Sequence, residues 1–375
     1  MDFTLDDEQQ LLRDTTRELL ARSYDPERRA EVVGSDLGWS REVWTTLADV
    51  GLLGLTFTEA DGGMGGGPVE TMAVMVELGR RLAPEPILDC VVLPGGLIAE
   101  VGTAVQRKQV LSQVAEGALL LAFAHTEPGI RWPSAEVTTR ATGSDGDWTV
   151  SGRKNPVLRG DCADRIVVSA ALPDGGTGLF LVDAQAAGVT RRAYRTHDGG
   201  RAAEIEFDGA PAELLGDTTD ATPAVERGIV RAQAALCAEA LGALEESLRL
   251  TTEYLKTRKQ FGVTLSKFQT LTQRAADMYV ALEEARSMVL YATACLAEGR
   301  VDPIVASRAK LQIGRSAKHI GQESIQLHGG IGMTAEYPVG HYFARLTVID
   351  QLFGAADDHL RLLSGQVADY TRVEL

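Results

Sequence analysis

The spacing of apolar residues changes twice along the chain and divides it into three zones. In residues 1–117, apolar side chains recur every three or four positions, as in "VETMAVMVELGRRL" (69–82), and this spacing predicts amphipathic helices. In residues 118–217, short runs such as "RIVVSAAL" and "GLFLVDA" alternate with turn-forming sets such as "PDGGTG", which predicts β-strands. From residue 223 onward the helical spacing returns, in long stretches without proline.

These zones predict an α+β fold. Closely spaced strands without helices between them indicate a small antiparallel sandwich or barrel, and long helices joined by short turns indicate an up-down bundle. We therefore predict an N-terminal helical domain (1–117), a middle antiparallel β domain (118–222) and a C-terminal four-helix bundle (223–375). The glycine-rich segment "EADGGMGGGP" (59–68) is interpreted as a flexible surface loop.

The composition is that of an ordinary globular protein, with 45% hydrophobic and 24% charged residues. No run approaches the length of about 18 apolar residues that a membrane-spanning helix needs, and the acidic start "MDFTLDDEQQ" is unlike a secretory signal. A net charge of −15 argues against nucleic acid and anionic membranes as partners. An anionic small ligand would therefore need a locally basic pocket.

The four cysteines, at positions 90, 162, 237 and 295, are far apart and show no C-x-x-C spacing. This pattern favours reduced thiols in a cytoplasmic protein and predicts neither a disulfide framework nor a zinc or other metal site.

The stretch "SIQLHGGIGM" (324–333) places three glycines in four positions within a region of helical spacing. Each glycine costs a helix about 1 kcal/mol relative to alanine. A formal G-x-G-x-x-A runs from Gly330 to Ala335, but a dinucleotide-binding turn requires a preceding strand, and helical spacing precedes it here. Two interpretations stay open at this point: a plain turn between helices, or a backbone that approaches an anion at the start of the next helix.

A second stretch, "EYLKTRKQFGVTLSKFQ" (253–269), ends a long predicted helix with Lys256, Arg258 and Lys259 and then turns at Gly262. Cations in a last helical turn are often only partners of the helix dipole. The combination of TRKQFG, then FQ, then QLHGGIG, followed by "TAEYPVGHYFAR" (334–345), is far more specific than any of its parts. It resembles the acyl-CoA dehydrogenase family of flavoproteins, whose helix–β–helix domain order covers the whole chain.

The resemblance implies that these two motifs bind FAD. Arg258 would pair with the pyrophosphate, because a guanidinium grips phosphate oxygens, and glycines without a Cβ would let the backbone approach the adenosine end. The implied FAD-binding residues are Arg258, Gln260, Phe261, Gln269, Gln326, Leu327, Gly329 and Gly330.

The catalytic base that the family uses has no counterpart at its usual places. The family's reaction, α,β-dehydrogenation of an acyl-CoA, needs a carboxylate that removes the α-proton while the flavin takes the β-hydride. Family members place that carboxylate in an I-Y-E-G-T-like stretch near the C-terminus or early in the first bundle helix. Here the first place holds Phe353 or Gly354, and the second falls near Ala232 and Gln233.

Three nearby acids remain as candidate bases: Glu239, Asp357 and Asp358. Two acids at a helix start are more often complements of the helix dipole. Glu239 lies about two helical turns beyond the second base position and so on the same face of the helix, where a buried, paired structural role is favoured. No substrate-binding residue is identified from the sequence.

The flavin-ring side of the middle domain also departs from the family. The loop T-E-P-G-A-G-S-D appears as "TEPGIRWPS" (126–134), which keeps residues 126–129 and loses the later glycine–serine end. The ring-facing strand W-I-T-N-G appears as "PVLRG", with Pro156 and Leu158 in place of the tryptophan and the threonine. Leucine cannot supply the hydrogen bond that the threonine makes.

These losses fall on one side of the FAD site. In the family's tetramers, one subunit supplies the ring pocket and the base, and its neighbour supplies the R-x-x-F-G and Q-x-x-G-G contacts. The chain resembles the small subunit of heteromeric (α2β2) acyl-CoA dehydrogenases, with an electron-transfer flavoprotein as the implied acceptor. The alternatives are a self-sufficient homotetramer with a displaced base, and a flavin-free structural or acyl-CoA-binding protein. The sequence does not identify the acyl group.

Overall fold

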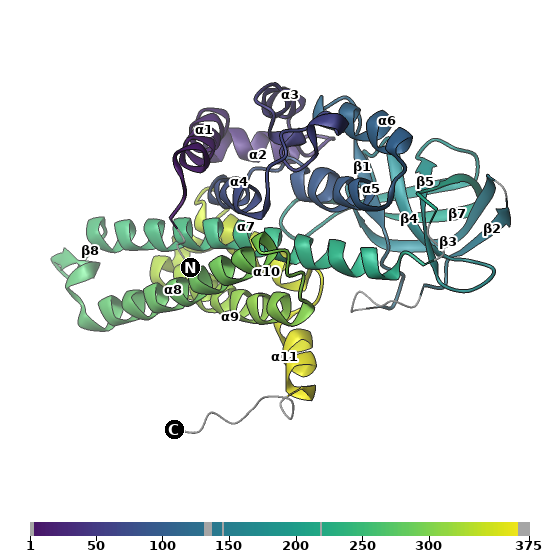
Figure 1. Ribbon diagram of the computed structural model, residues 1–375. Coiled ribbons are helices and arrows are strands. Elements are labelled where there is room, and N and C mark those ends of the chain that lie inside the picture. The colour runs from purple at the N-terminus through teal and green to yellow at the C-terminus, as the bar shows by residue number, and fades with distance from the viewer. Residues whose placement is uncertain (1–3, 131–136, 145, 218–219, 367–375) are drawn as a thin grey trace. The chain divides into compact units, whose positions relative to one another are not determined.

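The computed structural model describes residues 4–130, 137–144, 146–217 and 220–366 (Figure 1). These residues form two compact units. The first unit comprises residues 1–27, 72–83 and 233–375, and the second comprises residues 28–71 and 84–232. The zone that the sequence marks as N-terminal and helical is therefore divided between the two units, whereas the order of helices, strands and then helices along the chain is the predicted one.

The first unit is helical. Its long elements are α1 (Asp7–Ser23), α4 (Pro68–Arg81), α7 (Thr222–Thr257), α8 (Gln269–Ala297), α9 (Pro303–His328), α10 (Val339–Gln351) and α11 (Ala356–Gly365). The short elements are β8 (Lys259–Gln260), β9 (Val263–Thr264), η4 (Leu265–Lys267) and η5 (Gly329–Met333). The first residues of α4 and α7 belong to the second unit.

Helix α9 lies at the centre of the bundle and packs against α8, α10 and α11. Asp302 caps its start by accepting the backbone N–H of Ile304 at 2.8 Å, and Pro303 occupies the first helical position. Helices α4 and α7 touch backbone to backbone, since a Cβ on Gly242 would lie 1.9 Å from the carbonyl oxygen of Val76. Only glycine permits that crossing.

The helical part of the second unit consists of short elements. They are α2 (Pro26–Gly34), α3 (Arg41–Asp49), η1 (Leu52–Gly54), η2 (Glu59–Asp61), η3 (Ile87–Gly95), α5 (Gly96–Val101) and α6 (Ala104–Ala115). The glycine-rich segment after η2 is packed: a Cβ on Gly63 would lie 2.2 Å from the carbonyl oxygen of Phe57, and Gly66 donates its N–H to Leu55 O at 2.7 Å. The prediction of a flexible loop is therefore wrong, because these glycines serve close packing.

The remainder of the second unit is a seven-stranded sheet. Its strands are β1 (Leu121–Ala124), β2 (Arg140–Ser144), β3 (Asp147–Leu158), β4 (Arg165–Ala171), β5 (Thr177–Asp183), β6 (Val189–Arg195) and β7 (Arg201–Leu214). The order is β1-β4-β2-β3-β7-β5, and β5 also pairs with β4, so the sheet closes into a small barrel, while β6 joins β7. The pairings are antiparallel as predicted, apart from β1 with β4 and a single bridge of β2 with β4, which are parallel.

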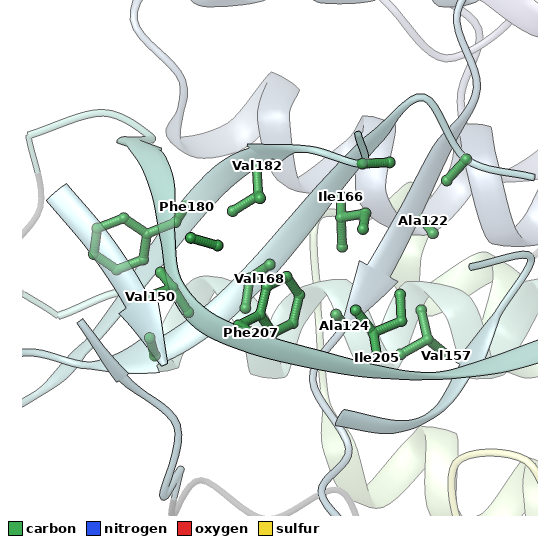
Figure 2. Packing of buried hydrophobic residues seen from close by; sticks show 14 of the residues in the cluster. Ala122, Ala124, Val150, Val157, Ile166, Val168, Phe180, Val182, Ile205 and Phe207 are labelled. Atoms are coloured by element: carbon green, nitrogen blue, oxygen red, sulfur yellow. The ribbon is translucent and has the colours of Figure 1, made fainter. Parts of the chain in front are cut away.

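The barrel is filled by alternate residues of its strands (Figure 2). Val150 and Val157 of β3, Ile166 of β4 and Ile205 of β7 are fully buried there. Lys154 lies between the two valines on β3 and is fully buried as well. A charged side chain is therefore buried together with the valines of β3, and it needs polar partners inside the protein.

Three further observations concern the residues that the structure describes. None of their helices combines the length and apolarity needed to cross a membrane. Within the same residues, no group of three or more His, Cys, Asp or Glu side chains is arranged to hold a metal ion. All four cysteines are free thiols, and burial raises the pKa of Cys90 and of Cys237 to about 12.

Candidate functional site

The TRKQFG motif forms a hairpin where α7 ends and α8 begins, at the position of β8 in Figure 1. Arg258 continues the helix by donating its N–H to Tyr254 O at 2.8 Å, and its carbonyl accepts Leu265 N at 2.9 Å. The turn is sharp, because Phe261 (φ +53°) and Gly262 (φ +82°) both adopt left-handed conformations. The Phe261 side chain is 91% exposed, so the hairpin presents an aromatic ring to its surroundings.

The hairpin is a basic segment on an acidic protein. Lys256, Arg258 and Lys259 are exposed, and the side chain of Arg258 makes no ion pair with any residue that the structure describes. Gln260, and Gln269 at the start of α8, are exposed on the same segment. A guanidinium without an ion pair can bind the negative charges of a pyrophosphate, and the exposed side-chain amides of the two glutamines can donate hydrogen bonds to its oxygens.

The QLHGGIG motif forms the end of α9 and the 3₁₀ turn η5. Gly329 has φ +65°, and no atom lies within 4 Å of the position of an added Cβ on Gly329 or Gly330. Both glycines and Gln326 are exposed, whereas Leu327 is buried. This part of the backbone is therefore open to a ligand.

The third glycine of the motif has a different role. A Cβ on Gly332 would lie 3.0 Å from both the Cβ of His328 and the carbonyl oxygen of Ile325. Gly332 is buried, and the absence of its side chain serves packing. The proposed contact with a cofactor therefore concerns Gly329 and Gly330, and Gly332 takes no part in it.

The two places where the family carries its base are neighbours in the first unit. Gln233 of α7 donates from Nε2 to the carbonyl oxygen of Phe353 at 2.9 Å, although the two residues are 120 positions apart. His359 Nε2 lies 3.2 Å from the same oxygen. Phe353 (φ +55°) and Gly354 (φ +95°) form a left-handed turn. These positions therefore hold an amide, an aromatic ring and a glycine, and none of them can accept a proton from carbon.

Of the three candidate acids, two form ion pairs with arginines and the third is exposed. Glu239 is 7% exposed, and its two carboxylate oxygens accept Arg345 Nε at 2.6 Å and Arg345 Nη2 at 3.0 Å. Asp358 accepts Ala355 N at 3.1 Å and pairs with Arg361 at 2.8 Å, which is the arrangement of a helix start. Asp357 is exposed in the first turn of α11.

The TEPG loop of the second unit is held by a buried ion pair that the sequence does not predict. Glu127 accepts Thr138 N at 3.0 Å, Thr139 N at 2.8 Å and Lys154 Nζ at 2.9 Å. Burial opposes ionisation of Glu127, but the hydrogen bonds from the two threonines and from Lys154 outweigh it and lower its pKa to about 2. Burial also lowers the pKa of Lys154 to about 8. Residues 131–134 of the predicted loop lie outside the described residues.

Two residues of strand β3 stand where family members contact the flavin ring. Pro156 is exposed and Leu158 is half-buried on β3, and neither side chain carries a polar atom. The neighbouring Asn155 accepts a hydrogen bond from the hydroxyl of Tyr194 at 2.7 Å. Neither of these two positions therefore offers an isoalloxazine ring a side-chain hydrogen bond.

Three family models match consecutive parts of the chain. The acyl-CoA dehydrogenase N-terminal domain matches residues 6–118, the middle domain residues 122–210 and the C-terminal domain residues 223–367. The chain belongs to the acyl-CoA dehydrogenase family.

Particular relatives cover nearly the whole chain. The chain is 32% identical to the acyl-CoA dehydrogenase IpdE2 of Mycobacterium tuberculosis, over 97% of this chain and 99% of that protein. Among solved structures it is similar to a variant of the Tcur3481–Tcur3483 steroid ACAD, with 32% identity, a TM-score of 0.89 and coverage of 98% and 99% of the two chains. It is also similar to the ChsE4–ChsE5 complex from Mycobacterium tuberculosis, with 28% identity, a TM-score of 0.90 and coverage of 99% and 100%.

Proposed function

We propose that this chain is one subunit of a heteromeric, FAD-dependent acyl-CoA dehydrogenase that catalyses α,β-dehydrogenation of an acyl-CoA thioester. It supplies the pyrophosphate and adenosine half of the FAD site, and a second family member supplies the flavin-ring pocket and the catalytic base. The observation that carries the proposal is the contrast between the two halves. The Arg258 hairpin and the Gly329–Gly330 turn are exposed and open, while Phe353 and Gln233 occupy the two base positions.

The residues of the first half fit FAD. The guanidinium of Arg258 would bind the pyrophosphate, Gln260, Phe261 and Gln269 would lie along the dinucleotide, and the backbone from Gln326 to Gly330 would line the adenosine. Gly329 and Gly330 have the space around them that a close approach of a nucleotide requires. When bound, FAD accepts the hydride that leaves the β-carbon of the acyl chain.

The α-proton must pass to a carboxylate that this chain does not place at either family position. Glu239 is a buried acid on the same helix face as the second position, about two helical turns away, and its ion pair with Arg345 uses both oxygens. A partner-supplied base follows, and with it a requirement for two different subunits. An electron-transfer flavoprotein as the acceptor of the electrons is carried over from the family resemblance.

The relatives support this assembly. Two of the similar solved structures, Tcur3481–Tcur3483 and ChsE4–ChsE5, are each named for a pair of proteins. A chain of the same length and fold that lacks its own base is what one member of such a pair would be.

The test is reconstitution. The chain is expressed alone and together with a family member from a neighbouring gene, and both preparations are assayed for bound flavin and for acyl-CoA oxidation with an artificial electron acceptor. We expect flavin and turnover only in the co-expressed complex, and loss of turnover with retained flavin when the partner's base is changed to its amide. A homo-oligomer of this chain that binds FAD and oxidises acyl-CoA would overturn the proposal in favour of a displaced base.

A further inference from the structure

Three aromatic rings connect the end of helix α7 to the end of helix α9. The ring centroids of Tyr254 and His328 are 4.5 Å apart, with their planes inclined by 31°. Those of His328 and Tyr337 are 4.8 Å apart, and those of Tyr254 and Tyr337 are 6.2 Å apart at 68°. Each ring therefore contacts the other two, and we call this group the aromatic cluster.

Hydrogen bonds fix the orientation of the central imidazole. His328 Nδ1 lies 2.7 Å from the carbonyl oxygen of Ser324, and a carbonyl can only accept, so Nδ1 carries the hydrogen. Nε2 is then an acceptor, and the Tyr337 hydroxyl lies 3.2 Å from it and can donate. His328 is 4% exposed, and burial lowers its pKa, which favours the neutral ring over the charged one.

The cluster is joined directly to both proposed cofactor segments. The carbonyl of Tyr254 accepts the backbone N–H of Arg258 at 2.8 Å, which places the ring one helical turn before the basic hairpin. His328 immediately precedes Gly329. It also packs closely against Gly332, since a Cβ on Gly332 would lie 3.0 Å from the Cβ of His328. The rings thus join two segments that lie some seventy positions apart in the sequence.

We propose that Tyr254, His328 and Tyr337 are positioning residues. They fix the separation between the Arg258 hairpin and the Gly329–Gly330 turn before FAD binds. This inference rests on the proposed FAD assignment of those two segments. A nucleotide that must contact both segments at once binds more tightly when their separation is already set, because less conformational freedom is lost on binding. The alternative is that the rings are ordinary core packing with no effect on the cofactor.

The experiment measures FAD affinity and stability separately. The co-expressed complex is stripped of flavin, FAD is titrated back, and the melting temperature of the FAD-free complex is recorded. Tyr254→Leu removes one ring of the cluster and should weaken FAD binding about two- to ten-fold. Tyr254→Phe, which restores the ring, should restore the affinity. Tyr279→Leu, the same change at a 56% exposed tyrosine of α8, is the matched control and should leave FAD affinity unaltered.

Tyr337→Phe tests the hydrogen bond without removing a ring. It should weaken FAD binding about two- to ten-fold with little change in the melting temperature of the FAD-free complex. The imidazole nitrogens of His328 can be read by NMR in the chain alone. We expect the neutral Nδ1–H tautomer, and a shift of the Nε2 resonance in the Tyr337→Phe variant.

The outcomes separate the inference from the function on which it rests. Arg258→Ala is measured in parallel. If it weakens FAD binding while Tyr254→Leu and Tyr337→Phe bind FAD like the unmodified complex, the positioning role is wrong and the FAD site stands. If Arg258→Ala also binds FAD normally, the assignment of the site itself has failed. An Nε2–H tautomer of His328 would contradict the hydrogen-bonding pattern of the cluster.

Discussion

Glu239→Gln distinguishes a structural glutamate from a displaced catalytic base. The carboxylate is buried on α7 and makes two hydrogen bonds to Arg345 of α10. Glutamine has the same shape and keeps one oxygen that accepts from Arg345, but it loses the charge and turns the other oxygen into an amide nitrogen, a second donor facing the guanidinium. If the pair is structural, the change should reduce stability and leave turnover of the complex within about two-fold, a change in barrier of about 0.4 kcal/mol.

The size of the loss follows from the burial of the two partners. Removing one partner of a fully buried ion pair costs about 3–5 kcal/mol. The Arg345 side chain is 22% exposed, and glutamine retains one hydrogen bond worth about 1 kcal/mol. We therefore expect the free energy of unfolding to fall by about 1–3 kcal/mol. In a unit of about 150–250 residues each kcal/mol lowers Tm by about 2–4 °C.

The assay is acyl-CoA turnover of the complex, with Tm measured on the same samples. Glu253→Gln is the matched control, because Glu253 lies on the same helix and pairs with Arg249 at 2.7 Å, but its side chain is 58% exposed. Its loss should change stability by less than about 0.5 kcal/mol. A fall in turnover of several decades at an unchanged Tm would identify Glu239 as the base and refute the reasoning.

Three further predictions concern other parts of the chain. Arg258→Ala should weaken FAD binding to the complex about ten- to hundred-fold, because a charge-assisted contact of about 1.5–3 kcal/mol is lost; equilibrium dialysis measures it. The urea midpoint of the second unit should fall as pH drops from about 4.5 to about 2, the window in which unfolded but not folded Glu127 binds a proton. Cys90 and Cys237 should resist iodoacetamide at pH 8 in the folded chain and react in urea, because burial raises their pKa values.

Controls make these three outcomes decisive. Arg315→Ala, at an exposed arginine of α9, should leave FAD affinity unchanged, and an equal loss in both arginine variants would mean that Arg258 has no specific contact. Glu127→Gln should flatten the pH dependence of the urea midpoint of the second unit below pH 4.5, so an unaltered slope in that variant would assign the dependence to other carboxyl groups. Rapid alkylation of Cys90 or Cys237 in the native chain would mean that the thiols are more accessible than their burial indicates.

The spacing of apolar residues and the positions of glycines predict those helices, strands and turns whose formation depends on nearby residues. The long helices and most strands follow from apolar spacing, and the TRKQFG and QLHGGIG motifs form turns at helix ends, as their glycines predict. Strand β6 was not predicted, because "VTRRAYR" shows no alternation and most of its side chains are exposed. Its strand conformation depends on pairing along its whole length with β7, which is a long-range interaction that the segment itself does not encode.

The same limit applies to the candidate site. A lysine in a strand is ordinarily solvated, so the buried pair of Lys154 with Glu127 could not be predicted without the fold that brings Thr138 and Thr139 to the same carboxylate. The hydrogen bond from Gln233 to Phe353 spans 120 positions, and the aromatic cluster also joins distant segments. The sequence identifies the residue types at the expected base and ring positions, whereas the contacts that those residues make could be found only from the structure.

The number of flavins per assembly tests the central claim most directly. In the proposed heterotetramer, the partner's ring pocket would meet the Arg258 hairpin and the Gly329–Gly330 turn of this chain, whereas the side chains of this chain's Pro156 and Leu158 offer a ring no hydrogen bond. Absorbance of the purified complex at the flavin band, set against its protein mass, should give about two FAD per four subunits, and the chain alone should be nearly colourless. Four FAD per tetramer, or a yellow and active homo-oligomer of this chain, would contradict the account.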